Sequence, residues 1–479
     1  MSSQPLTIVI KLGSSSILQP VPPHFPQMST LSSLAETCVN LRALGHRIVI
    51  VSSGAIGMGL HRMDLPATTS SAGKSRSMGE KQALAAIGQG RLIALWDQIF
   101  GAFKIPIAQI LLTRNDIADR SRYLNATTTL STLLSLGVIP IINENDTISV
   151  SEILTLNKFG DNDTLSAIAS GMCHADYLFL LTDVDGLYED NPRKVPTARR
   201  VTKVRDIEQV RKLVSTKTLG SSLGTGGMET KLIAAELATA VGCNTVITLG
   251  NKPERILEIV NQHQPSSITR PTTPTSTSST TSTSSNSSLP GVEFSSPSSS
   301  SDSAPHTLFT RKPTPLTSRR FWILHGLTPR GTVYIDYGAY RAISRSSKSD
   351  NSAEGGSHGN GGRLLAAGVV RVEGSFAAGQ AVNVSVVIKD EKGFEVEEKE
   401  FGRGLSNYNS SEINKVKGLK SSDIEKVLGY YEAEHVVESV VELSRGGIST
   451  TTTATSTSVG DPTTVVEGVE KLSVGGEKE

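Results

Sequence analysis

The sequence has few of the features that mark secreted, zinc-stabilised or membrane-spanning proteins. Its 479 residues include three cysteines, Cys38, Cys173 and Cys243, and none of them forms a CxxC pair. This spacing argues against a disulfide framework or a structural zinc site. The longest apolar runs are the length of a strand, too short to cross a bilayer. The first residues, MSSQPLTIVIKLG, lack the basic region and long apolar core of a signal peptide. We therefore expect a cytoplasmic protein with no membrane partner.

An excess of charge of either sign is also missing. Lys and Arg total 47 against 46 Asp and Glu, so the formal net charge is +1, and aromatic residues make up 5% of the chain. A balance of this kind gives no global attraction to nucleic acid or to an anionic membrane. Glycine, serine and threonine are abundant instead, and the length allows two or three domains.

Composition divides the chain into four parts. The stretch 265–317 is dominated by Ser, Thr and Pro, as is the tail 446–479. Such segments bury too little apolar surface to offset the entropy of ordering, so both are predicted to be disordered. Folded domains are predicted over 5–264 and 318–445. A further polar run, 344–362, is predicted to be a surface loop within the second domain.

The first domain alternates apolar, strand-like runs with helical stretches such as 78–103. Most of the runs are continuously apolar rather than alternating, as expected for strands that are buried on both faces. This texture predicts the α/β class, with a mainly parallel sheet covered by helices on both sides. The predicted strands begin near Thr7, His46, Ile105, Gly137, Asp176 and Cys243.

Small, polar and glycine residues follow four of these strands. Ligands of parallel sheets bind beyond the carboxyl ends of the strands, so the four stretches should meet at one rim. Each of them alone is also ordinary turn chemistry. Glycines in the first two can aim backbone N–H groups at a phosphate or carboxylate, and Lys11 adds a positive charge. The stretches are Lys11-Leu12-Gly13-Ser14, Ser52-Ser53-Gly54, Asn143-Glu144-Asn145-Asp146 and Thr182-Asp183.

Two further motifs carry charge. LGTGGMETK, which ends at Lys231, matches neither the P-loop nor GxGxxG, and it could cap a helix or hold a phosphate. KFGDNDTLS contains Asp161, Asn162 and Asp163, which could form a metal site, a site for a cationic ligand, or helix caps. Two lysines on glycine-rich loops beside these carboxylates favour phosphoryl transfer, which needs positive groups around the moving phosphate.

These motifs, in this order, resemble the glutamate 5-kinases of the amino acid kinase family. The resemblance covers residues 6 to about 260 and rests on VIKLGSS, VIVSSGAIGMG, INEND, KFGDND, LLTDVDGLY and GTGGMETK. From Arg319 onward, RRFWILHGLTPRGTVYIDYGA, GLSNYNSSEI and LGYYEAEHVV resemble a small, mostly-β PUA domain. The resemblance implies ATP-dependent phosphorylation of the γ-carboxylate of L-glutamate, the first step of proline synthesis. It also implies inhibition by L-proline, Mg²⁺ with the nucleotide, and a homo-oligomer.

The resemblance assigns roles to particular residues. Lys11 and Lys231 would stabilise the transferring phosphoryl group, and Asp163 would orient them. No residue is assigned as a metal ligand. The substrate would be held by Ser53, Gly54, Asn143, Asp146, Asp161 and Asn162, and the nucleotide by Lys11, Gly13, Ser14, Thr182, Asp183, Thr225, Gly226, Gly227, Met228 and Lys231.

Two alternatives remain at this point. Another member of the same family would phosphorylate carbamate, N-acetylglutamate or UMP, although acidic acceptors suit a free ammonium better than a blocked amine. An RNA-binding factor would use the PUA-like region, which has no dense Lys/Arg patch with interleaved aromatics. The sequence also departs from the resemblance in its 147–159 stretch, TISVSEILTLNKF, which is longer than expected.

Overall fold

The computed structural model describes most of the chain before residue 444. The described residues are 4–19, 23–66, 76–148, 162–190, 192, 195, 197–213, 227–263, 291–295, 304–349, 362–389 and 395–443. The predicted C-terminal tail therefore lies outside them, as does most of the long 147–159 stretch.

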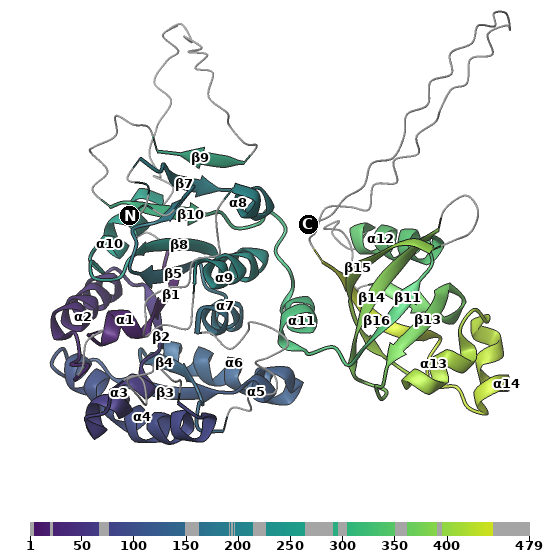
Figure 1. Ribbon diagram of the computed structural model, residues 1–479, viewed down its shortest axis with the longest axis horizontal. Helices are drawn as coiled ribbons and strands as arrows, with labels where there is room; N and C mark the ends of the chain where they lie inside the picture. Colours follow the sequence, from purple (N-terminus) through teal and green to yellow (C-terminus); the bar gives the residue numbers. More distant parts are fainter. Residues whose placement is uncertain are drawn as a thin grey trace, which may run out of the picture. The chain divides into compact units, whose positions relative to one another are not determined.

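The first domain contains one large sheet. Its strands are β1 Thr7–Leu12, β2 Arg47–Ser52, β3 Ile107–Leu112, β4 Ile139–Glu144, β5 Tyr177–Thr182, β6 Leu187–Tyr188, β7 Arg200–Val204, β8 Asn244–Leu249, β9 Val292–Phe294 and β10 His306–Phe309. The strand order is β3-β4-β2-β1-β5-β8-β10-β7-β6, with β9 paired to β7. The strands from β3 to β8 in this order are all parallel, which confirms the predicted sheet and its six predicted strands (Figure 1).

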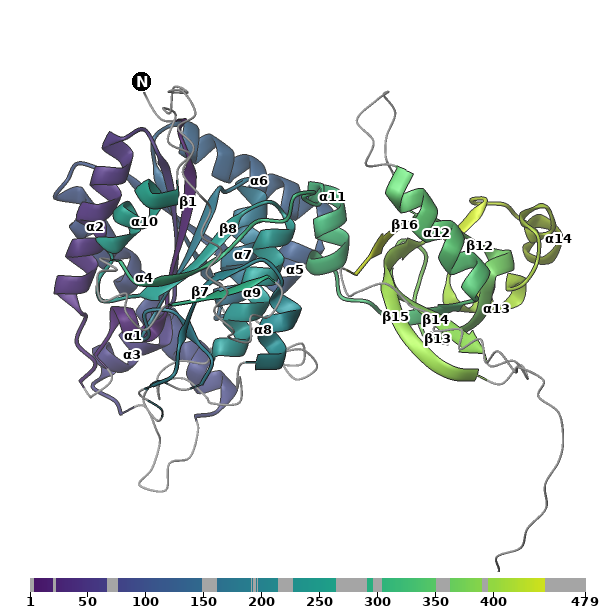
Figure 2. The ribbon, with the colours of Figure 1, turned by 90° about the horizontal axis from the view of Figure 1, so that it is seen from above.

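Helices cover both faces of this sheet. They are α1 Ser14–Ile17, α2 Met28–Ala43, α3 Ala55–Met63, α4 Met78–Gly101, α5 Arg114–Ala118, α6 Arg120–Ser135, α7 Asn162–Met172, α8 Ile207–Leu213, α9 Met228–Ala240 and α10 Arg255–His263. Figure 2 shows α2, α4 and α10 on one side of the sheet and α6, α7 and α9 on the other.

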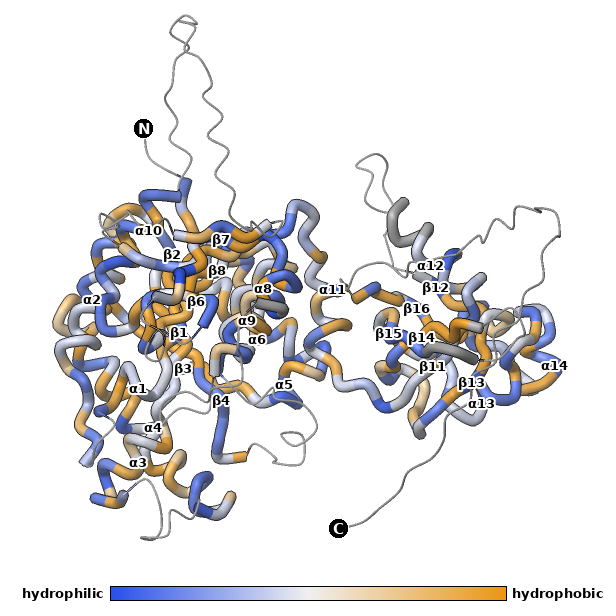
Figure 3. The backbone as a smooth tube through the Cα atoms, turned by 45° about the horizontal axis from the view of Figure 1, so that its top comes forward, coloured by the Kyte–Doolittle hydropathy of each residue, from blue (hydrophilic) through white to orange (hydrophobic). Residues whose placement is uncertain are grey.

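The central strand β1 has two buried faces because successive side chains point in opposite directions. Val9 packs in a core with residues of α6, α7 and α9. Ile8 and Ile10 pack in a second core with residues of α2, α4 and α10. The continuous apolar colour of the central strands in Figure 3 follows from this double burial, which explains why the strands read as unbroken hydrophobic runs.

The prediction of a disordered linker over 265–317 is wrong for part of that stretch. Strand β10 lies inside the sheet, antiparallel to β8 and parallel to β7, and β9 pairs with β7. The hydroxyl of Thr307 in β10 also accepts a hydrogen bond from the backbone N–H of Leu187 (2.8 Å). The sheet of the first domain therefore continues past residue 264. Composition concealed these short strands because Ser, Thr and Pro surround them on both sides.

The segment after β10 also packs on the first domain. It forms α11 Ser318–Phe321 and the π-helical turn η2 Trp322–Gly326. Phe321 and Trp322 belong to the core that includes α7 and α9. The indole N–H of Trp322 donates to the carbonyl of Ile117 (3.0 Å), and the Arg120 guanidinium lies 5.0 Å from the Trp322 ring.

The second domain is built on a mixed sheet. Its strands are β11 Gly331–Ile335, β12 Gly362–Leu365, β13 Val369–Gly374, β14 Ala381–Lys389, β15 Glu395–Ser406 and β16 His435–Glu442, in the order β12-β16-β15-β14-β11-β13. Its helices are α12 Tyr337–Ser349, α13 Ser410–Val416 and α14 Ile424–Leu428. Helix α12 covers 344–349, so the predicted surface loop is wrong for those residues, and 350–361 lie outside the description.

Two of the sequence stretches that resemble a PUA domain are joined by hydrogen bonds. The buried Tyr408 donates its hydroxyl to the carbonyl of Ala433 (2.7 Å), and the same hydroxyl accepts from the N–H of Glu432 and of Ala433. The side chain of Asn407 donates to the carbonyl of His435 (2.8 Å). NYN and YEAEH are therefore parts of one local structure.

Candidate active site

The polar strand ends meet beside β1, where the order of the strands reverses. The chain proceeds from β1 to β2 on one side of β1 and later returns to β5 on the other side. Lys11 lies near the end of β1, Asn143 near the end of β4 and Thr182 at the end of β5. The backbone N–H of Ser53 donates to the carbonyl of Leu12 (3.1 Å), which joins the first two strand ends. The sequence prediction of a common rim is confirmed for these residues.

Asp163 lies between two lysines from different parts of the chain. Nζ of Lys11 is 2.5 Å from Oδ1 of Asp163, and Nζ of Lys231 is 3.2 Å from Oδ2. The side chain of Asp163 is fully buried, and those of Lys11 and Lys231 are 5% and 8% exposed. Helices α7 and α9 pack against each other, which brings Asp163 and Lys231 together, and both helices contribute small residues such as Ala167 and Ala234 to the same core.

The two lysines keep the carboxylate ionised. Burial by itself would raise the pKa of Asp163, but the charges of Lys11 and Lys231 and the hydrogen bonds to the carboxylate lower this pKa well below its ordinary value. Asp163 also lies in the first turn of α7, where the helix dipole favours a negative charge. The cluster therefore carries one negative and two positive charges and has a net positive charge to offer to an anion.

A second cluster consists of amides and a hydroxyl. The side-chain amide of Asn162 donates to Oγ of Ser53 (2.7 Å) and to Oδ1 of Asn143 (3.1 Å). The amide of Asn143 in turn donates to Oε1 of Gln89 (2.8 Å). Oδ1 of Asn162 is buried and has no hydrogen-bond partner among the described residues. A buried carbonyl without a donor costs free energy, so this oxygen is suited to accept from a ligand such as an ammonium group.

Gln89 was not predicted from the sequence. It belongs to α4, whose Gly88 lies so close to α3 that an added Cβ would be 1.9 Å from the carbonyl oxygen of Ala55. This close approach positions the next residue, Gln89, against Asn143. The local signal was a glycine in the middle of a helix, which usually weakens a helix unless close packing requires it.

Asp146 has an unusual protonation equilibrium. Burial, followed by the nearby charge of Glu144, raises the pKa of Asp146 to about 7. A carboxyl group in this state is about half protonated at neutral pH. A cationic ligand beside it would favour the ionised form, so ligand binding and proton release at Asp146 should be coupled.

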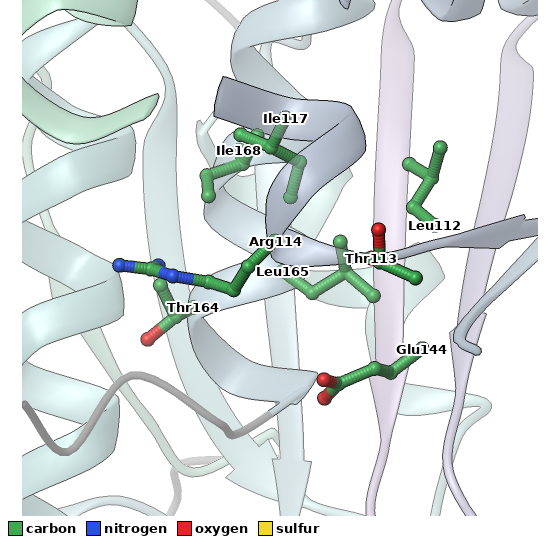
Figure 4. Close-up of a pocket in the computed structure, with 8 residues that line it drawn as sticks. All are labelled: Leu112, Thr113, Arg114, Ile117, Glu144, Thr164, Leu165 and Ile168. Atoms are coloured by element: carbon green, nitrogen blue, oxygen red, sulfur yellow. The ribbon is translucent and has the colours of Figure 1, made fainter. Parts of the chain in front are cut away.

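A small cavity lies next to these clusters, between α5, α7 and the ends of β3 and β4. Its volume is about 20 Å³, and its polar lining includes Thr113, Arg114, Glu144 and Thr164 (Figure 4). In the part of the chain that the structure describes, the buried hydroxyl of Thr164 has no hydrogen-bond partner. The volume fits a water molecule but is too small for an amino acid, so the cavity by itself is not a substrate site.

The remaining predicted site residues are a glycine beside Ser53, the residues predicted to bind the nucleotide, and residues that the structure does not describe. Gly54 has φ +108°, which favours glycine, and it caps the N-terminus of α3 beside Ser53. Gly13 and Ser14 follow β1 at the start of α1, Gly227 and Met228 begin α9 near Lys231, and the Thr182 hydroxyl donates to Asp183 (3.1 Å). Asp161, Thr225 and Gly226 lie outside the described residues.

Two kinds of feature are absent from the described part of the chain. No group of three or more His, Cys, Asp or Glu side chains there is placed to hold a metal ion directly. None of the described helices is long and apolar enough to cross a membrane.

Comparisons with known proteins identify the family of the chain. Residues 6–249 match the amino acid kinase family, and residues 350–428 match the PUA domain. A probable glutamate 5-kinase of Schizosaccharomyces pombe is 46% identical over 90% of this chain and 91% of its own. A glutamate 5-kinase of Rippkaea orientalis is 44% identical over 90% of this chain and 97% of its own. The structure of carbamate kinase from Giardia lamblia bound to AMP-PNP covers 55% of this chain and 97% of its own, with 17% identity and a TM-score of 0.39, too low to carry an argument.

The chain belongs to the amino acid kinase family. Within this family, the sequence identity to the two glutamate 5-kinases, over nearly the full length of each, places the chain among the glutamate 5-kinases. A PUA domain follows in the C-terminal part. The resemblance inferred from INEND, KFGDND and GTGGMETK is thereby confirmed.

Proposed function

We propose that the protein transfers the γ-phosphoryl group of ATP to the γ-carboxylate of L-glutamate, and that the described clusters are its active site. This proposal is carried by the two ion pairs that Asp163 forms with Lys11 and Lys231. Beside them lies the amide cluster, in which Oδ1 of Asn162 accepts no hydrogen bond from the described residues. One cluster suits phosphate oxygens, and the other suits the α-ammonium of an amino acid.

The lysines supply what this reaction needs. The γ-carboxylate of glutamate, with a pKa of roughly 4.3, is already ionised at neutral pH and requires no general base. The barrier comes from bringing this anion to an anionic phosphate, and charge spreads over the phosphoryl oxygens during transfer. Lys11 and Lys231 would stabilise that charge, while Asp163 holds both side chains at the correct place.

The amide cluster would hold the other end of the substrate. An ammonium group needs oxygen acceptors, and Oδ1 of Asn162 accepts no hydrogen bond from any described residue. Asn143, Asp146 and Asp161 would complete the acceptors, and Ser53 with the Gly54 backbone would meet a carboxylate. A free α-ammonium therefore distinguishes glutamate from N-acetylglutamate, whose amine is blocked.

The strand-end loops would hold the nucleotide. Gly13 and Ser14, Thr182 and Asp183, and the stretch Thr225–Met228 are proposed to surround it. Mg²⁺ would enter with the nucleotide and be held chiefly by phosphate oxygens, because the Asp163 oxygens already face Lys11 and Lys231. When bound, the ion would neutralise part of the phosphate charge.

The direct test is trapping of the acyl phosphate. The protein, Mg-ATP, L-glutamate and hydroxylamine should yield γ-glutamyl hydroxamate and a stoichiometric amount of ADP. The product should be absent when ATP or glutamate is left out. ADP formation without hydroxamate would contradict the proposed acceptor.

We also propose that L-proline inhibits the enzyme by competing with glutamate. Proline has a carboxylate and a cationic amine but no γ-carboxylate, so it could use the acceptors at Asn143, Asp146 and Asp161 without being phosphorylated. Steady-state rates at several proline concentrations should then show inhibition that glutamate relieves. Substitutions in the 147–159 stretch should weaken proline more than glutamate. A purely noncompetitive pattern would indicate a separate proline site.

The family resemblance supports two further proposals, a homo-oligomer and a cytoplasmic location. Sedimentation equilibrium of the purified protein would test the first, with a single monomeric species as the contradicting result. Fractionation of the cells that make the protein would test the second, with recovery in a membrane or organelle fraction as the contradicting result.

A further inference from the structure

Asp163 has a third partner that the phosphoryl-transfer chemistry does not account for. The hydroxyl of Thr230 lies 2.8 Å from Oδ2 of Asp163 and also 2.8 Å from the carbonyl oxygen of Gly227. Thr230 is 8% exposed and precedes Lys231 on α9. The Thr230 hydroxyl thus lies between the buried carboxylate of Asp163 and the carbonyl of Gly227, the N-cap of α9. Its own backbone is directly followed by Lys231, which also contacts Asp163.

A threonine hydroxyl has one proton, so it donates to one of these two oxygens at a time. A carboxylate is the stronger acceptor because a hydrogen bond to a charged group is about twice as strong as one between neutral groups. While both lysines remain on Asp163, the donors to this carboxylate include Lys11 at Oδ1 and both Lys231 and Thr230 at Oδ2.

The balance changes when the lysines act on a phosphate. Lys11 and Lys231 each have a flexible stem, and turning Nζ toward the phosphoryl oxygens weakens its contact with Asp163. Thr230 has a short side chain on a helix and cannot follow. Its hydroxyl therefore stays on the buried carboxylate while the lysine contacts weaken, and the loss of hydrogen bonds to a buried charge is costly.

We propose that Thr230 is a positioning residue, whose hydroxyl holds Asp163 in place while Lys11 and Lys231 act on the transferring phosphoryl group. The inference rests on the proposed function and adds to it a residue to which no role has been assigned. Thr230 acts through Asp163 and does not itself touch the phosphoryl group. Its effect should therefore appear in kcat rather than in the binding of either substrate.

Thr239 provides a matched control on the same helix. It is 2% exposed, and its hydroxyl donates to the backbone carbonyl of Ala235 (2.7 Å), away from the lysine–carboxylate cluster. Thr→Val at either position removes a buried hydroxyl and keeps the shape of the side chain. Thr→Ser keeps the hydroxyl and removes a methyl group.

The experiment compares kcat and both KM values in the full chain for Thr230→Val, Thr230→Ser, Thr239→Val and wild type. We expect Thr230→Val to lower kcat by about 10- to 150-fold, the range for losing a hydrogen bond to a charged group. Thr230→Ser should retain most of the activity, and Thr239→Val should leave kcat within about twofold. The KM values for glutamate and ATP should change by less than about threefold.

Three outcomes would overturn the inference. An unchanged kcat in Thr230→Val would remove the need for the hydroxyl. A loss as large in Thr230→Ser as in Thr230→Val would assign the effect to packing of the methyl group. A rise in the KM for ATP alone would mean that the hydroxyl acts through Gly227 and the nucleotide loop. If Thr230→Val does not fold, Thr230→Ala gives the same comparison with Thr230→Ser.

A double-mutant cycle separates this inference from the proposed function. In an Asp163→Asn background, Thr230→Val should reduce kcat by less than about threefold further, because the group on which the hydroxyl acts has already lost its charge. A full additional loss would contradict positioning through Asp163. If Asp163→Asn itself retained wild-type kcat, the proposed role of the carboxylate would fail, whatever Thr230→Val does.

Discussion

Nζ of Lys11, near the end of β1, lies 2.5 Å from Oδ1 of Asp163, in the first turn of α7. The helix is placed there because it packs against β1 and its neighbours. A carboxylate at the start of a buried helix thereby reaches a lysine from the centre of the sheet. Lys231 approaches the other carboxylate oxygen, so one anion lies between the two cations and attracts both.

Removal of either lysine should therefore act on the chemical step. We expect Lys11→Ala and Lys231→Ala each to lower kcat by about 10²–10³-fold, since each removes a charge that stabilises the transition state. Lys426→Ala, which changes an exposed lysine of the second domain, should have no effect. Initial rates at saturating glutamate and ATP measure this. A change confined to the KM for glutamate would contradict the assigned role.

The raised pKa of Asp146 predicts a pH dependence of glutamate binding. The substrate ammonium favours ionised Asp146, whose pKa in the free protein is about 7. Below pH 7 binding must therefore displace a proton, and KM for glutamate should rise about tenfold per pH unit as the pH falls.

Two variants test this assignment of the pH dependence. Asp146→Asn should flatten it, because no proton remains to be displaced. Glu144→Gln should move it to lower pH, because removing a like charge lowers the pKa of Asp146. An unchanged KM–pH profile in Asp146→Asn would assign the titration to another group.

Gly88 and Gly90 in α4 should respond to alanine in opposite ways. A Cβ at Gly88 would lie 1.9 Å from the carbonyl oxygen of Ala55, so α3 and α4 would have to separate, at a cost of about 1–3 kcal/mol. Gln89 would move with α4, and the KM for glutamate should rise. A Cβ at Gly90 meets nothing within 4 Å, so Gly90→Ala should stabilise the protein by about 0.5–1 kcal/mol.

Chemical denaturation and steady-state kinetics of the two glycine variants check this prediction. Equal stability of Gly88→Ala and Gly90→Ala would show that the approach of the two helices is not needed for the site.

Truncation should show where the kinase domain ends. A chain of residues 1–264 lacks β10, which lies between β8 and β7, and should not fold. A chain of residues 1–330 keeps β10 and the contact between Trp322 and Ile117, and it should fold and form hydroxamate. Thermal unfolding followed by circular dichroism and the trapping assay test both. A folded but inactive 1–330 chain would show that the second domain completes the site.

The sequence was sufficient to predict the main architecture and much of the site. Continuous apolar runs located the strands from β1 to β5 and β8, because strands buried on both faces need such runs. Sheet topology then brought Lys11, Asn143 and Thr182 to one edge. The sequence did not reveal strands β9 and β10, which are short and surrounded by Ser, Thr and Pro. Nor did the sequence reveal Gln89 and Thr230, whose side chains contact elements far away in the chain, which no local pattern encodes.

The central claim is that one site both transfers a phosphoryl group and recognises a free α-ammonium. It is tested most directly by comparing kcat/KM for L-glutamate and N-acetyl-L-glutamate in the hydroxamate assay, with wild type and Asn162→Ala. Wild type should favour L-glutamate by at least about 100-fold, because acetylation leaves the acceptors around Asn162 unpaired. Asn162→Ala, which removes the buried Oδ1 acceptor, should narrow this preference mainly by raising the KM for L-glutamate. Equal turnover of both compounds by wild type would contradict the account.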